Sequence, residues 1–251
     1  MTSQRQVLRA AHDPARSAKM ARSNGNAPPL HPIAVRPPSV RNIERHWMHG
    51  IVRRVEPKAH LFTEGDAKTH VFKVASGAVC LYKVLADGRR QIIEFALEGD
   101  LIGLCSAPVE ACNAQAMVPT RLQCLPLAVL LKAAQRDAKV ALGLYEALSR
   151  ELVATREHVL CVGQRGASER LATFFVILSR RNEQRGNDPQ TITLPMTRAD
   201  IADFLGLTIE TVSRTFSKLS RHGLIQIDQI TTIRLRNTGK LQRLAEGNVR
   251  V

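Results

Sequence analysis

The sequence predicts an α+β fold with three parts: a β-rich N-terminal domain, a long helix and a C-terminal winged helix-turn-helix. Three observations predict it. Glycines divide residues 52–127 into short apolar runs, as in a sandwich or barrel of short strands. Leucines then recur at helical spacing over residues 127–162. Finally, residues 191–236 hold two short capped helices joined by a glycine, followed by two apolar strands.

The charge of the chain is concentrated at its ends. The chain has 36 Lys and Arg against 22 Asp and Glu, a net charge of +14 at pH 7. Residues 1–41 hold seven cations and one acid, residues 161–251 hold fourteen and eight, and the stretch between them is nearly balanced. A basic end attached to a neutral centre indicates a polyanionic partner that meets one part of the molecule.

The composition argues against a secreted or membrane protein. The five cysteines are odd in number and form no C-x-x-C pair, unlike a disulfide framework. No apolar run is long enough for a transmembrane helix, and the basic N-terminus lacks the apolar core of a secretory signal. We therefore expect a cytoplasmic protein with no membrane partner.

Residues 1–40 are expected to be a disordered basic tail, because they contain six prolines and few large apolar residues to bury. Residues 41–130 are expected to form the β-rich domain. Its apolar runs are separated by glycines spaced by twelve, eleven and eleven residues, namely Gly65, Gly77, Gly88 and Gly99. We predict a hairpin turn at Asp87-Gly88, since Asp-Gly suits the positive φ of a tight turn.

A long amphipathic helix is predicted over residues 131–163. Charged residues there alternate with apolar residues at steps of four and seven: Leu144, Leu148, Leu152 and Val159. Two roles are open for this apolar surface, packing on its own domain and dimerisation through a helix-helix seam, for which these four residues are the candidates. The C-terminal domain is expected to span residues 164–251 and to begin with a helix near Ser168.

The helix-turn-helix is predicted from its caps. Thr197, followed by Asp200, is a helix N-cap with an acid at the third helical position. Gly206 ends that first helix, and Thr208 caps the second.

The second helix is predicted to have two faces. The inward face consists of Val212, Phe216 and Leu219, which are expected to pack against Ile201, Phe204 and Leu205 of the first helix. The candidates for reading base edges in the major groove lie on the outward face: Glu210, Ser213, Arg214 and Ile209. The candidates for contacts with the DNA backbone are Thr197, Arg198, Thr208, Thr211, Ser217 and Lys218.

A wing is predicted after this helix pair. Its strands are Leu224–Ile227 and Ile230–Leu235, joined at Asp228-Gln229. The local cations are Arg221, His222, Arg234 and Arg236. A capped helix pair, a polar outward face, a wing and local positive charge together favour DNA binding over a purely structural helix pair.

The sequence is similar to the CRP/FNR superfamily of bacterial regulators over nearly all of residues 45–240. The stretch LPMTRADIADFLGLTIETVSRTFSKL at 194–219 closely resembles the FixK/FnrN branch. So do Ser-Gly-Ala-Val at 76–79, Leu-Ala-Asp-Gly-Arg-Arg-Gln-Ile at 85–92 and Gly-Asp-Leu-Ile-Gly at 99–103. The resemblance implies an N-terminal β-roll (double-stranded β-helix) sensor domain, a dimerisation helix and a winged helix-turn-helix. It also implies a homodimeric transcription regulator whose partners are double-stranded DNA and RNA polymerase.

The resemblance assigns roles to particular residues. In this branch the triplet E-x-x-S-R, matched by Glu210, Ser213 and Arg214, reads a TTGAT-like half-site of a palindromic operator. Relatives that bind cyclic AMP carry a Glu and an Arg in a loop of the sensor domain, whereas residues 99–120 here contain no Lys or Arg. Relatives with an iron–sulfur cluster hold it with N-terminal cysteines, and none precedes Cys80 here. We therefore expect neither of these cofactors.

Two alternatives remain. One short stretch contains three cysteines, Cys105, Cys112 and Cys124. If they oxidise or bind metal, the chain is a cysteine- or metal-responsive sensor of the same superfamily. The other interpretation is that they fill the core as small apolar residues. A cupin-like metalloenzyme would need an H-x-H pair and a nearby Glu, but the chain offers only His60, Glu64 and His70, with no such pair. Signatures of hydrolases and of nucleotide-phosphate loops are also missing. We expect no enzyme, no catalytic residue and no metal site.

Overall fold

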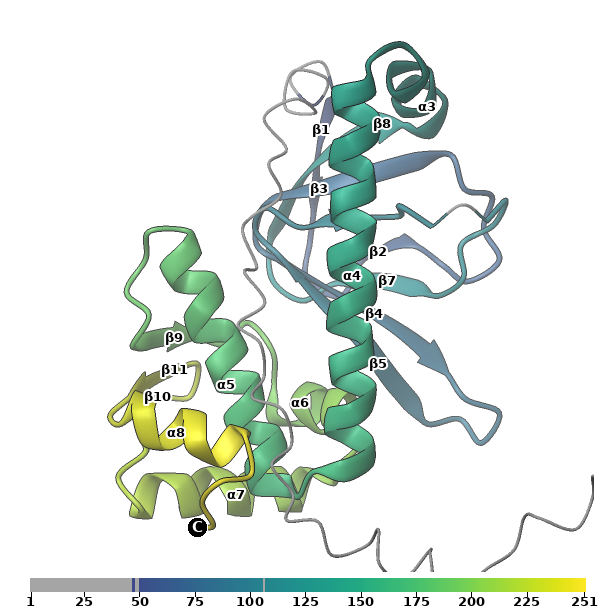
Figure 1. The fold of residues 1–251 in the computed structure, drawn as a ribbon. Helices are drawn as coiled ribbons and strands as arrows, with labels where there is room; N and C mark the ends of the chain where they lie inside the picture. Colours follow the sequence, from purple (N-terminus) through teal and green to yellow (C-terminus); the bar gives the residue numbers. More distant parts are fainter. Residues whose placement is uncertain (1–46, 48–49, 106) are drawn as a thin grey trace, which may run out of the picture. The chain divides into compact units, whose positions relative to one another are not determined.

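The structure is a computed structural model that describes residues 47, 50–105 and 107–251. The predicted tail at 1–40 lies outside the described residues. The α+β prediction is confirmed, with a β-roll, helices and a winged helix-turn-helix following one another along the chain (Figure 1). No helix among the described residues is both long and apolar enough to cross a membrane.

The β-roll consists of two four-stranded antiparallel sheets, in the orders β1-β8-β3-β6 and β2-β7-β4-β5. The strands are β1 Ile51–Val55, β2 His60–Phe62, β3 His70–Ser76, β4 Ala78–Val84, β5 Arg90–Leu97, β6 Leu101–Ile102, β7 Asn113–Ala116 and β8 Thr120–Pro126. Residues from both sheets, such as Val74, Val79, Ala96 and Leu122, are fully buried between them. Burial on one face of each sheet is what holds the register of these short strands.

The hairpin predicted at Asp87-Gly88 is confirmed. It joins β4 to β5, and the amide of Leu85 donates to the carbonyl of Arg89 at 2.8 Å across the turn. Gly88 has a φ of +82°, which few other residues adopt without strain.

The long helix differs from its prediction at the N-terminal end. Instead of one element there are two, α3 Leu127–Arg136 and α4 Ala138–Gln164. Asp137 separates them in an extended conformation, and its carboxylate accepts from the amide of Lys139 at 2.9 Å. Asp is favoured at the N-cap position and disfavoured in the interior of a helix. For this reason α4 starts just after Asp137.

The C-terminal domain has more elements than predicted. Its helices are α5 Ala167–Gln184, α6 Arg198–Leu205, α7 Ile209–Arg221 and α8 Thr238–Ala245, and its strands are β9 Thr191–Thr193, β10 Ile225–Gln229 and β11 Thr232–Leu235. Neither β9 nor α8 was expected from the sequence. β9 pairs with β11 to make a three-stranded sheet. α8, capped by the side chain of Asn237, packs Leu241 and Leu244 into the domain core.

The wing is present, but its turn is displaced. The predicted turn residues, Asp228 and Gln229, belong to β10, and the chain reverses instead at Ile230 and Thr231. A register shift between Ile227 and Gln229 accommodates the longer strand. The side chain of Ile230 is 91% exposed, so its apolar character does not mark a buried strand position.

Candidate nucleic-acid interface

The helix-turn-helix forms as its caps predict. Thr197 accepts from the amide of Asp200 at 3.1 Å, and Asp200 in turn accepts from the amide of Thr197 at 2.8 Å. Gly206 ends α6 in the left-handed conformation with a φ of +62°. Thr208 accepts from the amide of Thr211 at 3.2 Å and so starts α7. These caps set the angle at which α7 leaves α6.

The two predicted faces of α7 are observed. Val212, Phe216 and Leu219 are buried in the domain core. All four candidates for base reading are exposed on the other side: Ile209, Glu210, Ser213 and Arg214. Hydrogen bonds from its own amide and from Thr208 lower the pKa of Glu210, which favours the charged carboxylate. The exposed face therefore offers both an acceptor and a cationic donor.

The first helix also makes contacts outside the helix pair. Ile201 and Leu205 are buried, as expected. Phe204 packs against the same core cluster and makes ring contacts with Phe95 of β5 at 4.9 Å between centroids, with His158 of α4 at 4.2 Å and with Phe174 of α5 at 5.9 Å. Phe204 thus faces the β-roll and the long helix.

The candidates for backbone contact fall into two groups. Thr208 and Ser217 are exposed and Thr211 and Lys218 are half-buried, and the hydroxyls of Thr208 and Thr211 lie 3.0 Å apart. Thr197 and Arg198 are already engaged. The hydroxyl of Thr197 donates to Asp200 at 2.7 Å, and the guanidinium of Arg198 lies 3.2 Å from the ring centroid of Phe216.

The position of Arg198 affects its charge. Burial lowers the pKa of Arg198 to about 10, which still leaves the group protonated at neutral pH. Its stacking on an aromatic face is a common arrangement for Arg. The stacked guanidinium keeps its N–H donors in its own plane, so they are not used by the ring.

A hollow of about 710 Å³ lies beside the exposed face of α7. It is lined by the start of α5, by one side of α7 and by the C-terminal residues of the chain. Four cations line it: Arg214, Lys218, Arg221 and Arg250. A helix start and clustered cations are features that suit phosphate oxygens. Sequence reasoning did not find this hollow, because α5 and Arg250 lie far from α7 in the chain.

The wing arginines are partly occupied within the wing. Arg234 pairs with Asp228 at 3.2 Å, and Arg236 donates to the side chain of Gln226. Both arginines remain exposed. They therefore keep a local positive charge beside α7.

The residues of the two alternatives considered above lie in the β-roll, where Cys105 is exposed. Among the described residues, no group of three or more His, Cys, Asp or Glu is placed to hold a metal ion. His60 instead contacts the hydroxyl of Tyr82 at 2.9 Å, and Glu64 pairs with Lys83 at 2.8 Å. Cys124 is buried in the core, and burial raises the pKa of Cys112 to about 11, which suppresses thiolate reactivity.

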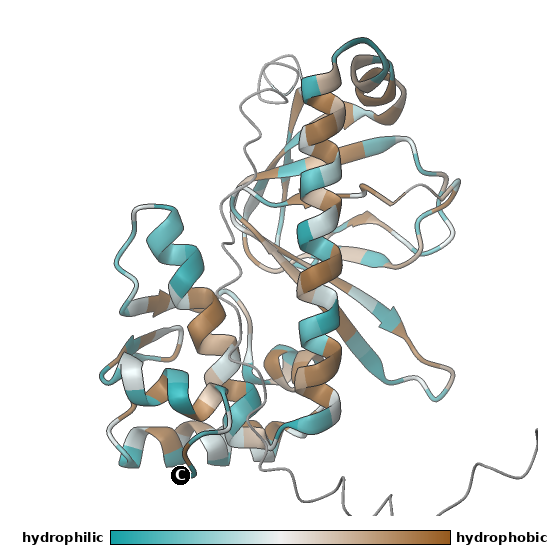
Figure 2. Ribbon diagram, in the orientation of Figure 1, coloured by the Kyte–Doolittle hydropathy of each residue, from teal (hydrophilic) through white to brown (hydrophobic). Residues whose placement is uncertain are grey.

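Hydrophobic residues alternate with hydrophilic ones along α4 (Figure 2). Three of the four dimerisation candidates are exposed: Leu148 at 43%, Leu152 at 50% and Val159 at 63%. Leu144 instead packs partly against its own β-roll, near Val71 and Val140. Tyr145, 68% exposed, takes its place in the seven-residue series with Leu152 and Val159. Leu144 thus packs partly on its own domain, whereas the other three candidates are exposed.

Comparison with known proteins identifies two family models in the chain. A Crp-like helix-turn-helix domain matches residues 169–244, and a cyclic nucleotide-binding domain matches residues 52–137. The nitrogen fixation regulation protein FixK of Bradyrhizobium diazoefficiens is 40% identical over 167 residues, which cover 66% of this chain and 70% of FixK. The transcriptional activatory protein AadR of Rhodopseudomonas palustris is 39% identical, over 69% of this chain and 73% of AadR.

Solved structures agree with these matches. The structure of FixK2 from Bradyrhizobium japonicum is similar with a TM-score of 0.74 and 37% identity, covering 78% of this chain and 96% of FixK2. A CooA mutant from Carboxydothermus hydrogenoformans, at 21% identity and a TM-score of 0.64, shares the fold over 79% of this chain and 89% of CooA.

Proposed function

The chain belongs to the CRP/FNR family of transcription regulators, and on that premise we propose that it is a FixK-like activator that reads DNA with the exposed face of α7. The observation that carries this proposal is the placement of Glu210, Ser213 and Arg214, which are all exposed on one face at spacings of three and one. The family and its helix-turn-helix support DNA binding in general. The operator sequence, the dimer and the absence of a cofactor are the finer parts of the proposal.

Each reading residue has a chemical role in the proposal. Arg214 donates two hydrogen bonds to O6 and N7 of a guanine, and Glu210 accepts from N4 of a cytosine. Ser213 contacts a neighbouring base edge, and Ile209 lies against a thymine methyl group. With the match to the E-x-x-S-R triplet, these roles fit a TTGAT-like half-site.

The backbone of the DNA is held around this face. Thr208, Thr211, Ser217 and Lys218 meet phosphates on the edges of α7, and the cations of the neighbouring hollow extend the same surface. Thr197 and Arg198 complete the set, with the Thr197 hydroxyl bonded to Asp200 and the Arg198 guanidinium stacked on Phe216.

A homodimer would present two such faces to one operator. The proposed seam is the exposed series Tyr145, Leu148, Leu152 and Val159 of α4, an a/d pattern of a parallel coiled coil. Leu144 has a smaller part, since its own domain partly covers it. Two-fold symmetry then predicts a palindrome with half-sites about one helical turn, roughly 34 Å, apart.

We propose that this regulator works without a cyclic nucleotide and without an N-terminal iron–sulfur cluster. The reason is the donor set, since residues 99–120 hold no cation for a cyclic phosphate and no cysteine precedes Cys80. Lys68, a cation near this region, is paired with Glu110 at 3.3 Å. RNA polymerase is the expected partner of the DNA-bound dimer, by analogy with the family.

Selection of bound sequences from a random DNA pool, with the purified full chain, tests the proposal. The expected result is a palindrome with TTGAT-like halves, bound by two copies of the chain and unchanged in affinity by added cyclic AMP. A pool that remains random after selection would overturn DNA reading by α7. A palindrome of another sequence would overturn the assignment of the three reading residues.

A further inference from the structure

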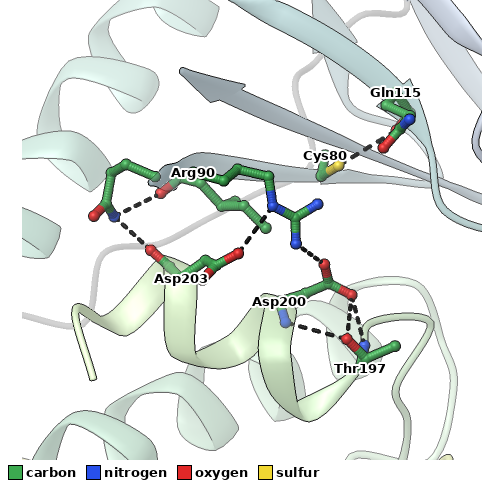
Figure 3. A network of polar contacts seen from close by, with 8 residues as sticks. Cys80, Arg90, Gln115, Thr197, Asp200 and Asp203 are labelled. Carbon is green, nitrogen blue, oxygen red and sulfur yellow. Dashed lines mark hydrogen bonds and ion pairs between the residues drawn. The ribbon is translucent and has the colours of Figure 1, made fainter. Parts of the chain in front are cut away.

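Arg90 lies where the β-roll meets the helix-turn-helix. It is the first residue of β5, and its guanidinium reaches two carboxylates of α6 (Figure 3). Its Nε donates to Oδ2 of Asp203 at 2.9 Å, and its Nη2 donates to Oδ1 of Asp200. The next residue, Gln91, donates from its side chain to the backbone carbonyl of Asp203. Two consecutive side chains of β5 thus hold one turn of α6.

The contact continues from Asp200 to the start of α6. While Oδ1 of Asp200 accepts from Arg90, its Oδ2 accepts from the amide and the hydroxyl of Thr197, at 2.8 and 2.7 Å. Asp200 is the acid of the capping box of α6. The same carboxylate therefore starts the helix and ties it to β5 (Figure 3).

An apolar contact and a second ion pair support the same arrangement. Phe95 of β5 lies 4.9 Å from Phe204 of α6 and 6.2 Å from Phe174 of α5, between ring centroids. Arg181 of α5 donates to Asp100, after β5, at 2.8 Å. β5 thus contacts both helices that lie before the reading helix.

The charges at this contact are only partly accessible to water. The side chains of Arg90 and Asp203 are each 30% exposed, and that of Asp200 is 13% exposed. Removing the arginine would leave two half-buried carboxylates, three residues apart on one helix, with no cation between them. Their negative charge would no longer be neutralised by Arg90, and it would lie beside a surface that meets a polyanion.

We propose that Arg90 is a positioning residue for DNA binding, which fixes α6, and through it α7, by pairing with Asp200 and Asp203. This inference rests on the proposed function. Arg90 itself does not read DNA. It keeps the helix-turn-helix in the orientation in which the reading face is exposed, and it neutralises the carboxylates of α6.

The first test compares Arg90→Ala with Arg89→Ala in the full chain. Arg89 is a matched control, because it is the neighbouring cation but pairs with Asp87 of its own turn and is 76% exposed. The dissociation constant for the selected operator should rise about tenfold for Arg90→Ala, a usual size for coupling between sites. It should change less than about twofold for Arg89→Ala, since surface pairs contribute little. Equal affinity for Arg90→Ala and wild type, tighter binding by Arg90→Ala, or an equal loss in both variants would overturn the inference.

A charge exchange separates positioning from a general loss of folding. Asp203 is the suitable partner because, unlike Asp200, it does not cap α6. Arg90→Asp and Asp203→Arg should each weaken operator binding, and the double variant should recover most of the wild-type affinity. Additive losses would overturn the pairing. Urea unfolding of the same variants checks that the affinity changes are not those of unfolded protein.

Hydrogen exchange of the free protein distinguishes this inference from the proposed function. Without DNA, amides of α6 should exchange faster in Arg90→Ala than in Arg89→Ala. Unchanged exchange in α6 would by itself overturn the inference that Arg90 fixes this helix. If the wild-type protein selects no DNA sequence, the proposed function is overturned, and so is the effect of Arg90 on DNA binding. This holds even if the exchange of α6 responds as expected.

Discussion

The replacement of Arg214 by Ala tests the base-reading face most directly. Arg214 is exposed at the centre of that face, one turn after Glu210. A bidentate contact between Arg and guanine contributes about 1–3 kcal/mol of discrimination. A dimer on a palindrome makes this contact twice, so we expect a loss of about 2–6 kcal/mol for the whole operator. Since about 1.4 kcal/mol is a factor of ten, the dissociation constant should rise at least roughly 30-fold.

The assay measures binding of the full chain to the selected operator and to versions in which the guanine of one or both half-sites is replaced. Wild type should lose affinity with each replacement, whereas Arg214→Ala should bind all three DNAs about equally. Lys218→Ala is the matched control, because Lys218 lines the neighbouring hollow but lies outside the reading triplet. It should weaken binding to all sequences alike and lower the salt dependence by about one unit per lost phosphate contact.

Two results would refute the assignment. If Arg214→Ala still discriminates against the replaced guanine by the wild-type factor, another residue reads that base. If Arg214→Ala weakens all sequences equally and flattens the salt dependence, Arg214 contacts the backbone instead.

Three further predictions concern stability and assembly. Lys68→Met should destabilise the fold by about 3–5 kcal/mol in urea unfolding, because Glu110 would keep a buried charge without its partner, and a loss below about 1 kcal/mol would contradict this. Burial, with Asp100 and Glu151 nearby, raises the pKa of Glu94 to about 7, so the folded state holds this proton more tightly than the unfolded state. The free energy of unfolding that the protonated Glu94 contributes is therefore lost as pH rises from about 4.5 to about 7, by up to roughly 3 kcal/mol. The variant Glu94→Gln should be more stable than wild type at pH 8 but not at pH 4. Leu152→Asp should convert the proposed dimer to a monomer, as measured by sedimentation at micromolar concentration. Ala154→Asp lies outside the proposed seam and should leave the mass of the complex unchanged.

The helix pair α6 and α7 could be predicted from the sequence because its information is local. A helix repeats its environment every three to four residues, so Val212, Phe216 and Leu219 define the buried side and, with it, the exposed side. Its caps lie within three residues of the positions that they satisfy. The hairpin at Asp87-Gly88 was predictable for the same reason.

Elements that depend on distant partners were missed. β9 has only three residues, and it becomes a strand by pairing with β11, about forty residues later. Leu144 and Tyr145 are both apolar, so the helical pattern could not say which of them faces the β-roll. The stacking of Arg198 on Phe216 was not expected, because the ring belongs to the next helix.

The contact of Arg90 shows why such residues leave little trace in a sequence. Arg90 follows a hairpin turn and looks like an ordinary surface cation, and Asp200 is fully accounted for as the acid of a capping box. Each explanation is correct and local. Only the fold brings β5 to α6, across 110 residues, and gives the second oxygen of Asp200 a partner. A residue whose local role is already explained can therefore carry a second, long-range role, and a carboxylate, with two oxygens and several lone pairs, is the side chain best able to hold both.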